Sequence, residues 1–120
     1  MSLGKSVIKD KSFAFAVRIV KLYKHLAEIK REFVLSKQLL RSGTAIGALV
    51  REAQNAESTK DFIHKLGIAQ KECDESIYWI ELLKETDFLT EREFDSMNKE
   101  AIELLKMLRS AIITSKKNNI

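Results

Sequence analysis

The two histidines and the single cysteine are the residues of this sequence best suited to metal or thiol chemistry. A di-iron centre in a helical bundle needs Glu-x-x-His on two helices and further glutamates on the other two. Only Asp61 and His64 approach that spacing, so we expect no metal centre and no cofactor. Cys73 falls on the apolar side of a predicted helix between Glu72 and Asp74, whereas a nucleophilic thiol needs a positive, accessible setting. A reactive cysteine is therefore not expected either.

Arg18 and His25 are the other pair that could do chemistry, because they are seven residues apart and nearly eclipsed on one helical face. Their spacing resembles the Arg-x6-His arrangement of a class of helical-bundle ribonucleases. In that class the motif lies on a late helix and a polar residue usually follows the arginine. Here it lies on the first predicted helix and Ile19 follows. The sequence therefore predicts a protein that is not an enzyme, and ribonuclease activity is the exception to test.

Basic residues are unevenly distributed along the chain, which carries a formal net charge of +4. Residues 5–31 contain eight basic and two acidic side chains, whereas residues 58–89 contain four basic and seven acidic ones. Lys11, Arg18, Lys21 and Lys24 lie roughly away from the predicted apolar rows, where they could contact phosphates. Two other interpretations stay open. The cations only keep the surface solvated, or they pair with the acidic third helix, within one bundle or across a subunit boundary.

The elements that carry these residues are predicted to be helices throughout. The 120 residues include no proline and only four glycines, and 45% are hydrophobic, so little in the chain interrupts a helix or supplies turns. Apolar periodicity predicts helices over about residues 5–30, 33–56, 59–86 and 91–115. Short connections then give an all-α fold, an antiparallel up-down-up-down four-helix bundle that forms a single domain over residues 1–120.

Membrane and secretion signals are not expected in this chain. Charges interrupt every apolar run well before the length that a membrane span needs. The N-terminal residues lack the apolar centre of a signal peptide, and a single cysteine cannot form an intramolecular disulfide. A cytoplasmic location is therefore expected.

The first helix carries more apolar surface than one neighbour would cover. One apolar row is predicted to face the core and a second runs beside it; the rows are Phe15, Ile19, Leu22, Leu26 and Ile29, and Phe13, Ala16, Val20, Tyr23 and Ala27. So wide a face is expected when a helix contacts two neighbours.

Further along the chain, two local signals mark helix starts: Ser58 with Asp61, and a capping box formed by Thr90 and Glu93.

Gly43 and Gly47 lie on one side of the second helix, although each costs about 1 kcal/mol relative to alanine in a helix interior. Their small size lets another backbone approach closely, either within the bundle or across a subunit contact. Tyr78 and Trp79 on the third helix could stack on bases or fill gaps, and we favour an inter-subunit contact, where aromatic anchors are common. All four are candidate residues for close helix packing or self-association.

The stretches QLLRSGTAIGALVREAQNAES and KDFIHKLGIAQKECDESIYWIELL resemble the central signature of small four-helix-bundle proteins encoded in intervening sequences of bacterial 23S rRNA genes. That family also includes the accessory variability determinants of diversity-generating retroelements. Ala45 and Leu49 depart from the signature, because the family often has serine and asparagine at these positions. The matching positions are Gln38, Leu39, Arg41, Ser42, Ile46, Gly47, Arg51, Glu52 and Ala53 in the second helix, and Phe62, Leu66, Ile68, Ala69, Glu75 and Leu82 in the third.

The resemblance implies a cytoplasmic bundle that assembles into a ring, in known cases a homo-pentamer with a positively charged surface. Retroelement relatives act as non-catalytic partners of a reverse transcriptase and nucleic acid. From the signature, Arg41 and Arg51 then join Arg18, Lys21 and Lys24 as candidate nucleic-acid contacts. The leading hypothesis is a non-catalytic homo-oligomer that binds RNA or DNA through phosphate contacts, as an accessory to an RNA or reverse-transcriptase complex. The alternative is an adaptor that binds another protein and no nucleic acid.

Overall fold

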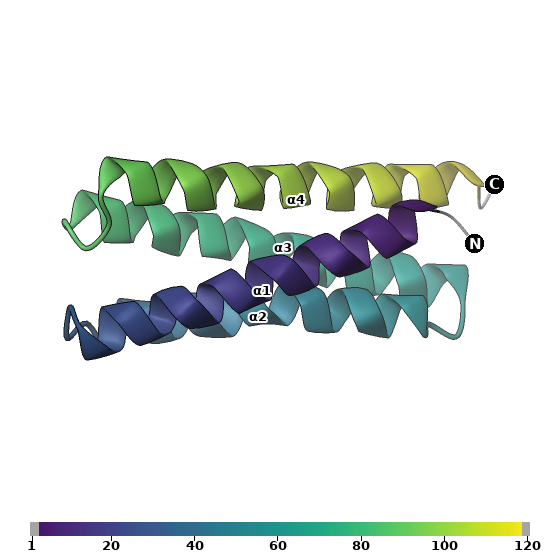
Figure 1. Ribbon diagram of the computed structural model, residues 1–120. Coiled ribbons are helices and arrows are strands. Elements are labelled where there is room, and N and C mark those ends of the chain that lie inside the picture. Colours follow the sequence, from purple (N-terminus) through teal and green to yellow (C-terminus); the bar gives the residue numbers. More distant parts are fainter. Residues whose placement is uncertain (1–2, 119–120) are drawn as a thin grey trace.

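The computed structural model describes residues 3–118 and consists of four helices joined by short loops (Figure 1). They are α1 (Leu3–Glu28), α2 (Leu35–Gln54), α3 (Thr59–Glu85) and α4 (Glu91–Asn118). Successive helices run in opposite directions, and the bundle is elongated, with extents of 49 × 21 × 20 Å. Residues 3–118 contain no strand. The predicted all-α, antiparallel bundle is confirmed.

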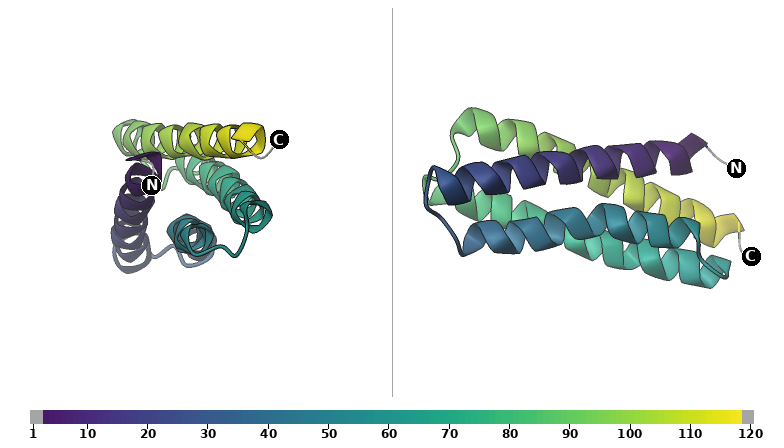
Figure 2. Two further views of the ribbon diagram at one scale, coloured as in Figure 1. Left: turned by 90° about the vertical axis from the view of Figure 1, so that its right-hand side faces the viewer. Right: turned by 60° about the horizontal axis from the view of Figure 1, so that its bottom comes forward.

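Seen along the bundle, α1 and α3 lie on either side of α2, and α4 crosses at an angle above them (Figure 2, left). Helix α2 packs against α1 and α3, and α3 also packs against α4, whereas the contact between α1 and α4 is smaller. Among the described residues, no ion pair joins α1 to α3. The basic first helix therefore does not pair with the acidic third helix inside one bundle, and that interpretation of the charge distribution is wrong for a single subunit.

Helix α1 ends earlier than its apolar pattern predicts. Arg31 has a φ of 58°, a left-handed backbone conformation in which a right-handed helix cannot continue, and α1 stops at Glu28. Ile29 consequently lies outside the helix. Its side chain is 68% exposed, although the predicted core row included it.

Helix α2 begins at Leu35, later than predicted, because Glu32 caps it. The Glu32 carboxylate accepts hydrogen bonds from the backbone N–H groups of Val34, Leu35 and Ser36, at 3.1, 2.9 and 2.6 Å. These are N–H groups that lack partners inside the helix. Burial raises the pKa of Glu32, but the backbone hydrogen bonds outweigh that effect, so that the pKa lies below its usual value.

The predicted starts of α3 and α4 are confirmed by their caps. Ser58 Oγ accepts a hydrogen bond from the backbone N–H of Asp61 at 3.0 Å. Thr90 and Glu93 form the reciprocal capping box, with distances of 2.8 and 3.1 Å. Helix α4 then continues to Asn118, past its predicted end, since neither glycine nor proline follows residue 67 to stop it. Fraying was predicted for residues 116–120, but residues 116–118 belong to α4, and residues 119 and 120 lie outside the described residues.

One hydrophobic core runs along the bundle, and α2, α3 and α4 supply most of it. Its largest fully buried side chains are Phe15, Ile19, Leu26, Leu39, Ile46, Leu66, Ile80, Leu83, Leu104 and Leu108. The second apolar row of α1 behaves differently, because Phe13 and Val20 are exposed rather than buried. Within residues 3–118, no helix is long and apolar enough to cross a membrane.

Candidate functional site

Gly43 and Gly47 bring α2 close against α1. A Cβ atom at Gly43 would lie 2.8 Å from Cγ1 of Ile19, whose side chain is fully buried. A Cβ atom at Gly47 would lie 3.3 Å from the backbone oxygen of Ser12. Both glycines therefore serve packing inside the subunit, where the close approach of the two helices offsets their low helix propensity.

Helix α1 presents a line of large apolar side chains on the side opposite the core. Phe13, Val17 and Val20 are 54%, 38% and 37% exposed, and their spacing by four and three residues places them on one face of the helix. We call these three residues the α1 stripe. The guanidinium of Arg51 on α2 lies 5.2 Å from the centre of the Phe13 ring, beside one end of the stripe. Sequence reasoning missed Val17, although its spacing from Phe13 and Val20 was the available signal.

Lys21 and Lys24 extend the outer side of α1 beyond the stripe. Lys21 is four residues after Val17, and Lys24 is four residues after Val20, so each lies one helical turn further along. Both side chains are exposed. Among residues 3–118, neither lysine forms an ion pair or a side-chain hydrogen bond. Their charges are therefore available to an outside partner.

Arg18 is directed toward α4. Its Nη1 lies 2.8 Å from Glu100 Oε2, and its Nη2 donates to Ser96 Oγ at 2.9 Å. These bonds join the two helices that share the smaller contact of the bundle and balance the arginine's charge. No hydrogen bond between described residues links Arg18 to His25, so the structure does not join the ribonuclease-like pair directly.

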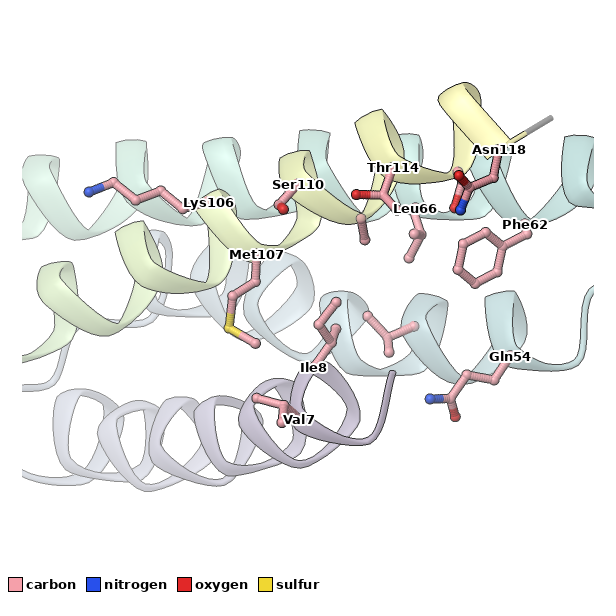
Figure 3. A pocket seen from close by; sticks show the side chains of 13 residues that line it. Val7, Ile8, Gln54, Phe62, Leu66, Lys106, Met107, Ser110, Thr114 and Asn118 are labelled. Carbon is pink, nitrogen blue, oxygen red and sulfur yellow. The ribbon is translucent and has the colours of Figure 1, made fainter. Parts of the chain in front are cut away.

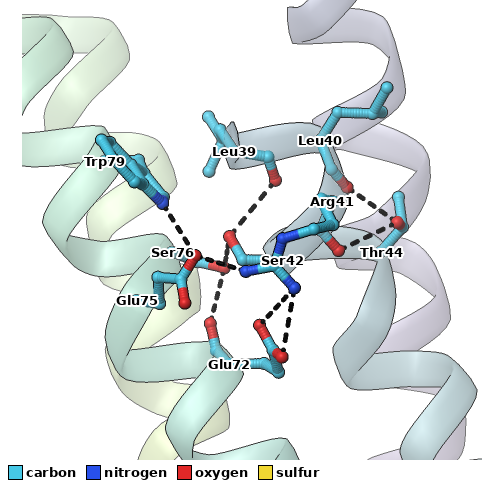
Figure 4. Close-up of polar contacts among 9 residues, drawn as sticks. All are labelled: Leu39, Leu40, Arg41, Ser42, Thr44, Glu72, Glu75, Ser76 and Trp79. Atoms are coloured by element: carbon cyan, nitrogen blue, oxygen red, sulfur yellow. Dashed lines mark hydrogen bonds and ion pairs between the residues drawn. The ribbon is translucent and has the colours of Figure 1, made fainter. Parts of the chain in front are cut away.

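Arg41 lies in a polar network between α2 and α3 (Figure 4). Its Nη1 donates to Glu72 at 3.3 Å, its Nη2 donates to the carboxylate of Glu75, and Trp79 Nε1 donates to the same Glu75 carboxylate at 3.1 Å. The hydrogen bonds to Glu72 and Glu75 raise the pKa of Arg41. The bond from Trp79, followed by that from Arg41, lowers the pKa of Glu75 against the opposing effect of desolvation. Two carboxylates around one guanidinium leave the position negative, which disfavours contact with a phosphate.

The same helix pair holds two buried hydroxyl groups. The Oγ atoms of Ser42 and Ser76 are hydrogen-bonded at 2.8 Å, and Ser76 Oγ also lies 2.9 Å from the backbone oxygen of Glu72 (Figure 4).

On the outer side of α3, the rings of Tyr78 and Trp79 meet edge to face at 4.9 Å. Trp79 packs against the core, whereas Tyr78 is 56% exposed. Of the two aromatic candidates, Tyr78 is the one whose ring can reach a partner.

Cys73 lies in the core and its Sγ donates to the backbone oxygen of Ala101 at 3.2 Å. Burial raises the pKa of the Cys73 thiol to about 12, so the thiol is protonated at neutral pH. In the part of the chain that the structure describes, no three histidine, cysteine or acidic side chains gather to hold a metal ion. The nearest match to a metal motif, Asp61 with His64, is not part of such a group.

The five predicted cations thus occupy three different settings. Arg18 is bonded to α4 and Arg41 to α3, whereas Arg51 lies over an exposed phenylalanine ring. Of these five, only Lys21 and Lys24 share a surface without an internal partner among residues 3–118. The site that remains is therefore the outer side of α1, made of the apolar stripe and the two lysines.

Comparison with known proteins identifies the family of this chain. The profile of the family described as 23S rRNA-intervening sequence protein matches residues 5–110. A crystal structure of a protein with unknown function from the S23 ribosomal protein family of Bacteroides thetaiotaomicron VPI-5482 is 53% identical, and the match covers 92% of this chain and 98% of the relative, with a TM-score of 0.91. No curated protein matches. Since the family profile spans most of the sequence, the chain belongs to the 23S rRNA-intervening sequence protein family.

Proposed function

We propose that this protein is a non-catalytic homo-oligomer in the cytoplasm that binds RNA or DNA through phosphate contacts, as an accessory to an RNA or reverse-transcriptase complex. The observation that carries the proposal is the outer side of α1. There the three apolar residues of the α1 stripe are exposed in a line, and Lys21 and Lys24 beside them lack an internal partner among residues 3–118.

The α1 stripe supports self-association. Single exposed apolar side chains are common on soluble proteins, but neighbouring ones that form a patch mark interaction sites. Burying one large apolar side chain contributes about 1.5–3 kcal/mol. A second copy can cover the stripe in each subunit, and a closed ring of five copies, as the family resemblance implies, would leave none uncovered.

The two lysines support nucleic-acid binding. A positive side chain that already pairs with a carboxylate must break that bond before it can neutralise a phosphate, and this applies to Arg18 and Arg41. Lys21 and Lys24 have no such bond to break. Phosphate contacts of this kind give affinity without sequence preference and make it depend steeply on salt.

A double charge reversal tests the proposal. The double variant Lys21→Glu with Lys24→Glu should strongly weaken binding to a generic DNA duplex at about 50 mM salt. The slope of the logarithm of the binding constant against the logarithm of the salt concentration should become shallower by about 1.8, which is about 0.9 for each phosphate that is no longer neutralised. Lys71→Glu with Lys99→Glu is the matched control, because both lysines are exposed on α3 and α4 and make no ion pair among residues 3–118. Equal weakening by the two double variants would mean that only total charge matters, and would overturn the assignment to α1.

An adaptor that binds another protein is the second candidate. Arg18 and Arg41 favour this candidate, because each forms an ion pair with a glutamate of the same subunit. Fewer positive side chains then remain for phosphate contacts than the sequence predicted. An intact oligomer that binds neither DNA nor RNA at about 50 mM salt would support the adaptor and remove the nucleic-acid proposal. Degradation of RNA by the purified protein, abolished by Arg18→Ala, would instead establish a ribonuclease.

A further inference from the structure

The four helices leave a pocket of about 780 Å³ at the end of the bundle where α2 and α4 end and α1 and α3 begin (Figure 3). Its apolar wall draws on all four helices, through Ile8, Val50, Leu66 and Met107. The first three of these residues belong to the hydrophobic core. Pockets of about 300–1,000 Å³ with mainly apolar walls are typical small-molecule sites, and the space between the helices of a bundle is one of their common places.

Most of the polar residues that line the pocket lie on α4, and Gln54 on α2 adds one more. Lys106, Ser110 and Thr114 line it at intervals of four residues, so they lie one after another along the same side of the helix. Met107 and Ala111 form an apolar row next to them. Among the described residues that line the pocket, Lys106 is the only charged one and no acidic side chain occurs. The pocket therefore has an apolar side, a hydroxyl-bearing side and a single positive charge.

We infer that this pocket binds a linear amphiphile with one carboxylate, of the class of medium-chain fatty acids. Its alkyl chain lies against Ile8, Leu66 and Met107, and its carboxylate lies at the rim near Lys106 and Ser110. In Figure 3 the ammonium group of Lys106 points away from Phe62 and Leu66, so the charged head can stay in water while the chain is buried. A cationic amphiphile would be repelled by Lys106, because no acidic side chain lines the pocket to balance the two positive charges. The pocket contains neither the α1 stripe nor Lys21 and Lys24, so this inference stands apart from the proposed function.

Methionine methyl groups provide a local readout. Protein labelled with ¹³C at its methionine methyls is titrated with sodium decanoate, and the Met107 signal is assigned with the Met107→Leu variant. The Met107 resonance should shift and saturate, whereas that of Met97, which is buried and does not line the pocket, should not move. An unmoved Met107 resonance would overturn the inference. So would a Met107 resonance that shifts with protein concentration before decanoate is added, since a second copy of the chain would then fill the pocket.

Two variants separate the head group from the chain. Lys106→Met should weaken decanoate binding about tenfold, because a hydrogen bond to a charged group is removed, and should leave the binding of decanol unchanged. Lys99→Met, on the same helix but outside the pocket, is the matched control and should bind decanoate as the wild type does. Ala111→Leu should fill the pocket and reduce binding of both compounds, with helical circular dichroism as the check on folding. Decanoate affinity that is unchanged in Lys106→Met would overturn the role of the carboxylate.

Discussion

Replacing Gly43 with alanine tests how closely α1 and α2 are packed. The added Cβ atom would lie 2.8 and 2.9 Å from two carbon atoms of Ile19, a fully buried side chain that cannot move into solvent. Overpacking of this kind costs about 1–3 kcal/mol of unfolding free energy, whereas alanine gains about 1 kcal/mol over glycine in a helix interior. The substitution is therefore expected to lower stability by up to about 2 kcal/mol, despite its better helix propensity.

Gly67→Ala is the matched control, since Gly67 lies inside α3 and a Cβ atom there would have no neighbour within 4 Å. It should show the propensity gain alone, about 1 kcal/mol of added stability. The two variants should then differ by about 1–3 kcal/mol, which isolates the cost of packing. Urea unfolding followed by far-ultraviolet circular dichroism measures both. Equal stabilisation by the two substitutions would show that α1 and α2 are not in close contact at Gly43.

Three further predictions concern buried polar groups. Glu32→Gln removes the carboxylate that caps α2 and should lower the free energy of unfolding by about 1 kcal/mol. Because the pKa of Glu32 is lowered in the folded chain, the wild type should lose this extra stability as pH falls through that pKa. Thermal unfolding of both proteins at neutral and acidic pH measures the loss. Ser76→Ala should cost about 1 kcal/mol, and a double-mutant cycle with Ser42→Ala should give a coupling energy of about 0.5–1.5 kcal/mol, whereas strict additivity would contradict the shared bond. Cys73, with a pKa of about 12, should react with a thiol reagent at neutral pH only as the chain unfolds in urea, and rapid labelling of the native protein would disprove its burial.

The starts of α3 and α4 were predictable because their signals are local. Ser58 with Asp61, and Thr90 with Glu93, lie within one turn of the backbone groups that they cap, so neighbouring residues alone decide the geometry. The end of α1 was not predictable in this way. Its apolar spacing continues through Ile29, and the break comes from the left-handed backbone at Arg31, which no glycine or proline announces.

The candidate site was predictable only in part, because a sequence shows the face of a helix but not its neighbours. Arg18 and Lys21 looked equivalent on the outer side of the first helix. The structure places Ser96 and Glu100 of α4 beside Arg18 and no partner from residues 3–118 beside Lys21. Likewise Arg41 meets acids that lie 31 and 34 residues further along the chain. Such pairings depend on which helices are adjacent in the bundle.

We propose that copies of this chain cover one another's α1 stripe and leave Lys21 and Lys24 outside. The most direct test is the molar mass of the purified protein in dilute solution, measured by light scattering. We expect a closed assembly, which for five subunits of 13.8 kDa has a mass of 69 kDa. A mass of 13.8 kDa at every concentration would contradict it.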